Sequence, residues 1–232
     1  MRAHEIEQIK SSHLFRDMAD EHFSSLVKAA YLQRFPAHVQ LLHEGDRPDF
    51  LHILLEGGVE LYSRHDDRET VIAIIRPVTT FILAAVVGDF PYLASARTLE
   101  AARILMIPAE SVRDISDKDT AFARSLVREL SLAFRGVMRE LKNQKLRTSA
   151  ERLANWMLQV SSRNGATGRF TIPYDKRTLA SLLGMTSENL SRSFVILASH
   201  GATTRGRQVT INDPAKLAIF AKPSRTMDEA EN

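Results

Sequence analysis

The stretch 178–199 reads TLASLLGMTSENLSRSFVILAS and predicts two short helices separated by a turn at Gly184. In each half, apolar residues recur three or four positions apart, which is the spacing of one buried helix face. Thr186 follows the turn and can cap the second helix with its hydroxyl oxygen. The outer face of that helix is polar. A helix, a glycine turn and a second helix with a polar outer face form the helix-turn-helix pattern, whose second helix fits the major groove of DNA.

The positive charge of the chain is concentrated around this stretch. The 232 residues have a formal net charge of +3. Eleven Lys and Arg stand against four Asp and Glu in residues 146–222, whereas residues 1–145 and 223–232 each carry a slight acidic excess. A local basic surface is what binding to the DNA backbone requires. The alternative is an ordinary solvated basic surface.

The composition excludes several classes of protein. No apolar run approaches the roughly 20 residues that span a bilayer, and the polar start MRAHEIEQIKSS has no signal-peptide core. We therefore expect a cytoplasmic protein that does not insert into a membrane. Cysteine is absent, which excludes disulfides, thiolate zinc sites and cysteine-ligated iron–sulfur clusters. No metal site is predicted.

The rest of the chain divides into recognisable segments. Residues 1–116 predict short helices, then short strands with Gly or charged turns, as in a sandwich or small barrel. Residues 117–146 predict a long helix. Its apolar positions recur with coiled-coil spacing and predict the seam of a dimer; they are Ala123, Leu126, Leu130, Ala133, Val137 and Leu141. The alternative is an amphipathic helix that packs on its own sheet.

Residues 147–222 predict the helix-turn-helix domain with its flanking elements. Thr148 and Glu151 form a capping-box pattern at the start of one helix. Residues 202–211 predict a hairpin that turns at Gly206 and forms a wing beside the second helix of the motif. Residues 223–232 are polar, and we expect a disordered tail.

This order of segments resembles the Crp/Fnr superfamily of bacterial transcription regulators. The stretch Leu41–Leu61, LLHEGDRPDFLHILLEGGVEL, and an E-x-x-S-R pattern typical of the Fnr branch carry the resemblance. FILAAVVGDFPYLASARTLE and PYDKRTLASLLGMTSENLSR are similar to NnrR-type, nitric-oxide-responsive regulators of denitrifying bacteria. The resemblance implies an α+β fold with a cyclic-nucleotide-binding-like β-roll, a dimerisation helix and a winged helix-turn-helix. It also implies a homodimeric, signal-responsive activator that contacts double-stranded DNA and RNA polymerase.

The second helix of the motif supplies the residues expected to contact bases. The fork of Arg192 matches guanine O6 and N7, and Glu188 can accept from cytosine N4 or hold Arg192 in place. Ser191 can touch thymine. Ser187 stands where the Crp branch has an arginine, so the resemblance implies a palindrome of TTGA-like half-sites, about 10 bp apart. The alternative for Glu188 and Arg192 is a surface ion pair. Five further residues are expected to contact phosphates, namely Lys176, Arg177, Thr186, Arg205 and Arg207.

The predicted roll lacks the residues that bind a cyclic nucleotide. Relatives that bind one carry Phe-Gly-Glu, with an arginine ten residues after the glutamate. Here the segment reads Phe81-Ile82-Leu83, and the arginine position falls near Leu93. Without a cation, a cyclic phosphate would be buried at high cost, so cyclic AMP is not expected. The same losses argue against the alternative of a cyclic-nucleotide-binding regulatory protein, which also has no use for a helix-turn-helix.

The apolar segment 81–87 leaves two hypotheses for the signal. NnrR-type relatives are thought to use haem, which needs apolar walls and an axial histidine. His13 and His52 are the preferred ligands, because His13 lies near the start of the roll and His52 alternates with apolar residues; the other candidates are His22, His38, His43 and His65. Alternatively, the segment fills the roll and the regulator acts constitutively without a ligand.

An enzyme is the remaining class to consider, because β-rolls also host metal-dependent cupins. Cupins need an H-x-H pair, and this sequence contains none. It also contains no Ser/His/Asp arrangement, P-loop or G-x-G-x-x-G motif. The sequence therefore predicts a protein that is not an enzyme.

Overall fold

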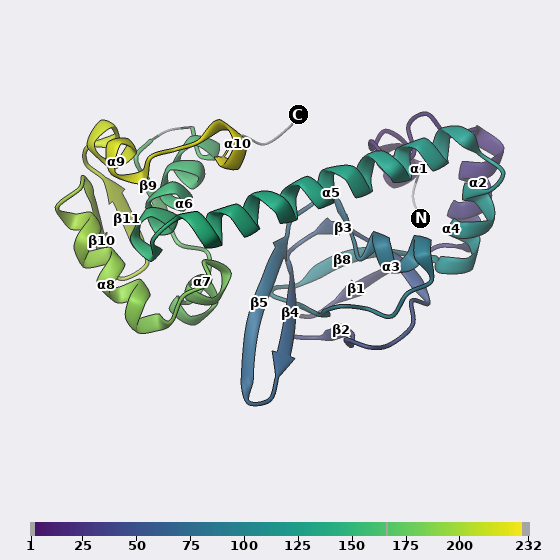
Figure 1. Ribbon diagram of the computed structural model, residues 1–232. Helices are drawn as coiled ribbons and strands as arrows, with labels where there is room; N and C mark the ends of the chain where they lie inside the picture. Colours follow the sequence, from purple (N-terminus) through teal and green to yellow (C-terminus); the bar gives the residue numbers. More distant parts are fainter. Residues whose placement is uncertain (1–2, 166, 229–232) are drawn as a thin grey trace. The chain divides into compact units, whose positions relative to one another are not determined.

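The computed structural model describes residues 3–165 and 167–228, which form two compact units (Figure 1). The first unit reaches Ala133, and the second begins at Phe134. Helix α5 (Thr120–Leu146) contributes to both. Among the described residues, no helix is both long and apolar enough to cross a membrane.

The first unit contains the β-roll that the resemblance implies, and the short apolar runs form its two antiparallel four-stranded sheets. One sheet has the order β1 (Tyr31–Phe35), β8 (Ala102–Pro108), β3 (Phe50–Glu56), β6 (Thr79–Phe81). The other has the order β2 (Gln40–Leu42), β7 (Ser95–Thr98), β4 (Val59–His65), β5 (Arg68–Ile75). Gly57 turns the chain between β3 and β4 with a φ of +86°, and a Cβ there would collide with the carbonyl oxygen of Ala101. This turn therefore requires glycine.

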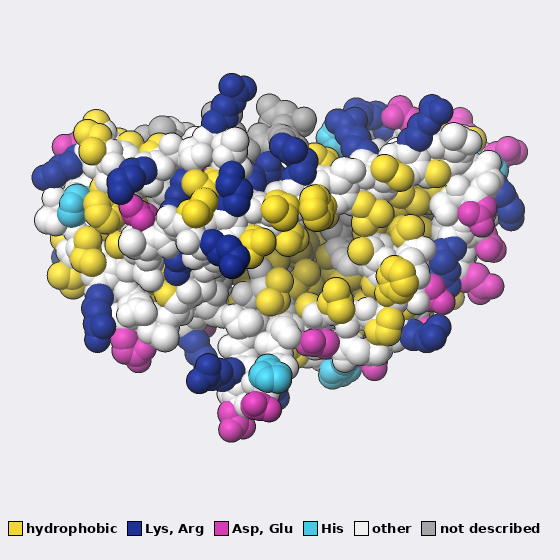
Figure 2. Space-filling model, viewed as in Figure 1, with side chains coloured by type: hydrophobic (Ala, Val, Ile, Leu, Met, Phe, Trp, Pro, Cys, Tyr) yellow, Lys and Arg dark blue, Asp and Glu magenta, His cyan; other side chains and the backbone are white. Residues whose placement is uncertain are grey.

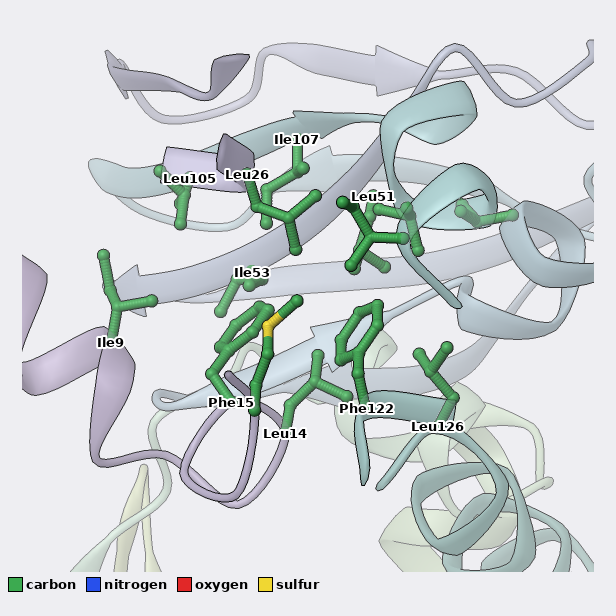
Figure 3. Packing of buried hydrophobic residues seen from close by; sticks show 14 of the residues in the cluster. Ile9, Leu14, Phe15, Leu26, Leu51, Ile53, Leu105, Ile107, Phe122 and Leu126 are labelled. Atoms are coloured by element: carbon green, nitrogen blue, oxygen red, sulfur yellow. The ribbon is translucent and has the colours of Figure 1, made fainter. Parts of the chain in front are cut away.

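Strand β3 is buried on both faces, so it separates two apolar clusters. Leu51, Ile53 and Leu55 belong to the cluster between the sheet and the helices. Figure 3 shows this cluster, where the rings of Phe15 and Phe122 stack with centroids 5.9 Å apart. The helices that contribute to it are α1 (Ala3–Lys10), α2 (Asp20–Ala29), α3 (Leu83–Gly88), α4 (Ala109–Ser116) and the first turns of α5. On the opposite face, Leu54 points into the interior of the roll.

The second unit is the winged helix-turn-helix. It contains helices α6 (Ser149–Arg163), α7 (Lys176–Leu182), α8 (Ser187–Ala198) and α9 (Pro214–Ala221), and a sheet of β9 (Arg169–Thr171), β10 (Ala202–Arg205) and β11 (Gln208–Ile211). The capping box at Thr148 is confirmed, because its hydroxyl accepts from the Glu151 N–H and the Glu151 carboxylate accepts from the Thr148 N–H. The hairpin β10–β11 turns at Gly206, which confirms the expected wing. Leu153, Leu179 and Leu190 meet in the apolar core of this unit.

The expectation of a disordered tail is wrong for its first part. Arg225–Asp228 form a short helix, α10, whereas residues 229–232 lie outside the described residues. The Asp228 carboxylate binds the nearly buried Arg147 guanidinium through two short contacts, of 2.6 and 2.7 Å. It also accepts from the Ser224 backbone N–H at 2.6 Å. A buried Arg147 needs an anionic partner, and the tail supplies it.

Candidate nucleic-acid interface

Side-chain caps fix where the two helices of the motif begin. The Asp175 carboxylate accepts from the Thr178 N–H at 2.7 Å at the start of α7. The Thr186 hydroxyl accepts from the Asn189 N–H at 3.2 Å at the start of α8. Between the helices, Gly184 has a φ of +60°, in the left-handed region that favours glycine. The turn and both caps therefore follow from local sequence.

Arg152 holds this turn from behind, and sequence reasoning missed it. Its side chain is buried, and its three guanidinium nitrogens donate to the carbonyl oxygens of Leu183, Arg147 and Gly184, at 2.8, 2.7 and 3.0 Å. Burial lowers the pKa of Arg152, which the negative charge of Glu140 partly offsets. The cation lies at the C-terminal end of α7, where the helix dipole favours positive charge. Arg152 thereby joins the start of α6 to the turn of the motif.

The outer face of α8 is exposed and polar. Ser187, Glu188, Ser191 and Arg192 are all exposed, in the arrangement that their spacing predicts. Glu188 has a lowered pKa because it accepts hydrogen bonds from its own backbone N–H and the Thr186 hydroxyl and lies near the Arg192 charge. Ser191 donates its hydroxyl to the Ser187 carbonyl oxygen at 3.0 Å. The face thus presents an ionised carboxylate and an exposed guanidinium that lie close enough to interact.

The five residues expected to contact phosphates differ in exposure and in the hydrogen bonds that their side chains already make. Lys176 and Arg177 are exposed at the start of α7, and Arg205 is exposed at the end of β10. Arg207 is exposed as well, but its Nε donates to the Ile172 carbonyl oxygen at 2.8 Å, which ties the wing to the residue after β9. Thr186 serves first as the cap of α8. On the face in Figure 2, Lys and Arg side chains are spread over this unit.

Two apolar residues on α8 are exposed and were not singled out from the sequence. Val195 is 75% exposed and Ile196 is 44% exposed. They fall outside the stripe of Leu190, Phe194 and Leu197 that packs into the unit. The sequence did contain a signal for their exposure, because neither residue has the helical spacing of the buried stripe.

Comparisons with known proteins agree with this architecture. Residues 32–119 match the cyclic nucleotide-binding domain, and residues 151–220 match the Crp-like helix-turn-helix domain. A CRP-like cAMP-activated global transcriptional regulator of Mycobacterium tuberculosis is 24% identical, over 90% of this chain and 96% of its own length. The transcriptional activator protein Anr of Pseudomonas aeruginosa is also 24% identical, over 78% and 76%. The structure of FixK2 from Bradyrhizobium japonicum superposes with a TM-score of 0.72 at 19% identity, over 84% and 98% of the two chains.

The chain belongs to the Crp/Fnr family of transcription regulators. The two matched domains together cover most of the chain, in the order that the fold shows. The two relatives are transcription regulators and not enzymes, which agrees with the expectation from the sequence.

The exposed apolar residues on the long helix of this Crp/Fnr regulator coincide only in part with the expected dimer seam. Leu126 is 3% exposed because it packs in the core of its own unit, so it is not available for a dimer seam (Figure 3). Leu130 is partly buried against the same core. Val137 and Leu141 of the expected seam are exposed. The helix also exposes three apolar residues that the expectation did not include, namely Val127, Phe134 and Met138. Ala123 is half-buried and Ala133 is exposed. The first turns of α5 therefore pack against the core of their own unit, as the alternative expected. The later turns expose their apolar residues.

The roll of this Crp/Fnr regulator offers no charge for a cyclic phosphate at the two expected positions. Leu83 is buried among the helices, and Leu93 is 90% exposed. Phe81 is 3% exposed and fills the interior of the roll. Ile82 follows it with a φ of +60°, a strained conformation for a β-branched residue. Among the described residues, no group of three His, Cys, Asp or Glu could hold a metal ion.

The two preferred haem ligands lie in separate places. His52 is buried, and its ring centroid lies 5.3 Å from that of Phe81 in the roll interior. Burial lowers the pKa of His52 to about 4, an effect that the Phe50 backbone offsets only in part. His13 is exposed and lines a cavity of about 370 Å³ on the other face of β3. One haem could not use both histidines in this arrangement.

The four other candidate histidines are surface residues or have a structural role. The His22 imidazole makes a hydrogen bond of 3.0 Å with the Asp119 carboxylate, which ties the start of α2 to the start of α5. The other three, His38, His43 and His65, are exposed.

Proposed function

We propose that this chain is a homodimeric activator that reads a palindrome of TTGA-like half-sites. The observation that carries the proposal is the exposed row Glu188, Ser191 and Arg192 on α8. The Arg192 fork would donate to O6 and N7 of guanine, and the ionised Glu188 would accept from N4 of cytosine. Ser187 offers no arginine to read a further base, which favours TTGA over TGTGA.

The neighbouring residues would position the helix on the DNA backbone. Lys176 and Arg177 lie beside each other on α7, and Arg205 lies on the wing. Because the Nε of Arg207 is bound to the protein, only the other nitrogens of its guanidinium would reach a phosphate. Thr186 caps α8 with its hydroxyl oxygen and donates its hydroxyl hydrogen to Glu188, so a phosphate contact would require that hydrogen to turn away from Glu188. Such contacts fix the register without reading sequence.

We propose that α5 pairs with its copy in a second chain. Val127, Phe134 and Leu141 recur every seven residues and are exposed, with Leu130 and Val137 between them in the alternation of a coiled coil. Phe134→Glu should convert the dimer into a monomer, as measured by analytical ultracentrifugation. Gly136→Glu is the matched control, because its added Cβ would meet no atom within 4 Å. A Phe134→Glu protein that stays dimeric would remove this interface.

The palindrome is tested by binding to duplexes of defined spacing. Wild-type protein should bind TTGAT-N4-ATCAA more tightly than a scrambled duplex in a fluorescence anisotropy titration. Five extra base pairs between the half-sites place them on opposite faces of the helix, so affinity should fall to that of a single half-site. Equal affinity for all three duplexes would contradict sequence-specific reading. Activation, which the name of the relative Anr suggests, is tested by in vitro transcription with RNA polymerase.

For the signal, we propose haem ligation by His52 as a second candidate function, in line with the resemblance to NnrR-type regulators. Its Nδ1 is buried without a hydrogen-bond partner among the described residues, and its lowered pKa keeps the imidazole neutral, as ligation requires. The donor fits, but Phe81 fills the adjoining space and would have to move. His13 fits less well, because Glu129 and Thr80 make its cavity partly polar.

A haem titration decides between this candidate and a regulator without a ligand. Wild-type protein should give a saturable Soret band that His52→Ala removes and His13→Ala keeps. A titration that never saturates would favour the constitutive regulator instead. Cyclic AMP should leave DNA affinity unchanged, because neither Leu83 nor Leu93 can pair with its ribose or phosphate.

A further inference from the structure

The outer face of α8 carries an apolar residue that the proposed reading of DNA leaves unexplained. Val195 is 75% exposed, whereas Leu190 and Leu197 on the same helix are fully buried. An exposed β-branched residue lowers the stability of a helix slightly compared with alanine. The Val195 side chain therefore contributes little to the packing of its own unit.

The spacing of α8 places Val195 on the same face as the residues that would read bases. It follows Glu188 by seven positions, so it lies within about 20° of the same direction and roughly 10.5 Å farther along the axis. It also lies three positions after Arg192, on the next turn. If the first turns of α8 lie in the major groove, Val195 faces the base edges beyond them.

The chemistry of valine restricts what it can contact there. Its side chain neither donates nor accepts hydrogen bonds, so it cannot bind a phosphate oxygen or the polar edge of a base. The apolar group that the major groove exposes is the C5 methyl group of thymine. Burying two methyl groups against it removes apolar surface from water and favours thymine over cytosine at that position.

We propose that Val195 is a specificity-determining residue that contacts the C5 methyl group of one thymine in each half-site. The inference rests on the proposed reading of DNA by α8. It extends the sequence that each subunit reads beyond the contacts of Glu188 and Arg192. The neighbouring Ile196, which is 44% exposed, would cover the edge of the same contact.

The test replaces thymine by deoxyuridine, which removes the methyl group alone. Each thymine of the palindrome is replaced in turn, in both half-sites, and binding is measured by anisotropy for wild type and Val195→Ser. Wild type should lose about three- to five-fold per half-site at one thymine position, the effect of one buried methyl group. Val195→Ser should bind the natural duplex more weakly and show no further loss at that position.

A matched control uses another exposed apolar residue of the same unit. Ile219 is 78% exposed on α9, outside the proposed interface, so Ile219→Ser should keep the wild-type deoxyuridine profile. An unchanged profile in Val195→Ser, or a wild type indifferent to every deoxyuridine, would overturn the inference. If either result is found while sequence-specific binding still depends on Arg192, only the role of Val195 is contradicted. Absence of sequence-specific binding by wild type contradicts the proposed function, and this inference with it.

Discussion

Replacement of Arg152 by methionine should destabilise the winged unit while leaving the outer face of α8 intact. Methionine keeps much of the aliphatic volume but removes three hydrogen bonds, to the carbonyl oxygens of Leu183, Arg147 and Gly184. A hydrogen bond from a charged donor contributes about 1.5–3 kcal/mol, so the three together contribute roughly 5–9 kcal/mol. The methionine variant does not bury a cation, so it avoids a desolvation cost of several kcal/mol and this offsets part of the loss. The net loss should be about 3 kcal/mol.

The fluorescence of Trp156 gives a direct assay, because it is the single tryptophan of the chain and lies in α6. Its ring packs against Phe170 with centroids 5.9 Å apart, so its emission reports on unfolding of the winged unit. With a urea slope of about 1.5 kcal/mol/M, the midpoint should fall by roughly 2 M. Arg163→Met is the control, since Arg163 is exposed on the same helix and should change stability by less than about 0.5 kcal/mol. Equal midpoints for the two variants would refute the role of Arg152.

Three further predictions concern strain and buried charge. Ile82→Gly relieves a strained φ, which should recover about 1–2 kcal/mol of stability. It should therefore destabilise the first unit less than Ile75→Gly, which truncates a residue packed in the same cluster. Equal losses of Tm in the two variants would contradict the strain at Ile82. Burial alone would raise the pKa of Asp119, but its hydrogen bonds lower it to about 2. The folded state therefore gains about 1–2 kcal/mol above pH 4 and loses it as pH falls toward 2; Asp119→Asn should flatten the Tm between pH 5 and 2. Asp228→Asn leaves Arg147 buried without its anion and should lower stability by about 3 kcal/mol, whereas an unchanged Trp emission midpoint would show that the tail is dispensable.

Local patterns made much of the second unit predictable. The caps, the Gly184 turn and the wing depend on residues within a few positions of one another, so the sequence displays them directly. Arg152 was not predictable, because a buried arginine that binds backbone carbonyls leaves no pattern of partner residues. The tail was misjudged because Arg147 and Asp228 are 81 residues apart. Polar composition alone does not reveal such a contact.

The long helix shows a second limit of periodicity. Its apolar residues follow one repeat, but the first turns pack in the core of the first unit, while later turns expose their apolar residues. A repeat in sequence does not distinguish a core from a partner chain, so Leu126 was placed in the seam and Phe134 was missed. The pairing of His52 with Phe81 was similarly hidden, because it depends on the register of β3 with β6.

The central claim is that Arg192 reads the guanine of a TTGA half-site, and a two-by-two binding measurement tests it most directly. Wild type and Arg192→Ala are each titrated with the TTGA palindrome and with one in which the G·C pairs become A·T. A bidentate contact provides about 1–3 kcal/mol of discrimination per half-site, so wild type should prefer TTGA by at least ten-fold. Arg192→Ala should bind both duplexes with equal affinity. A variant that still prefers TTGA as strongly as wild type would contradict the assignment.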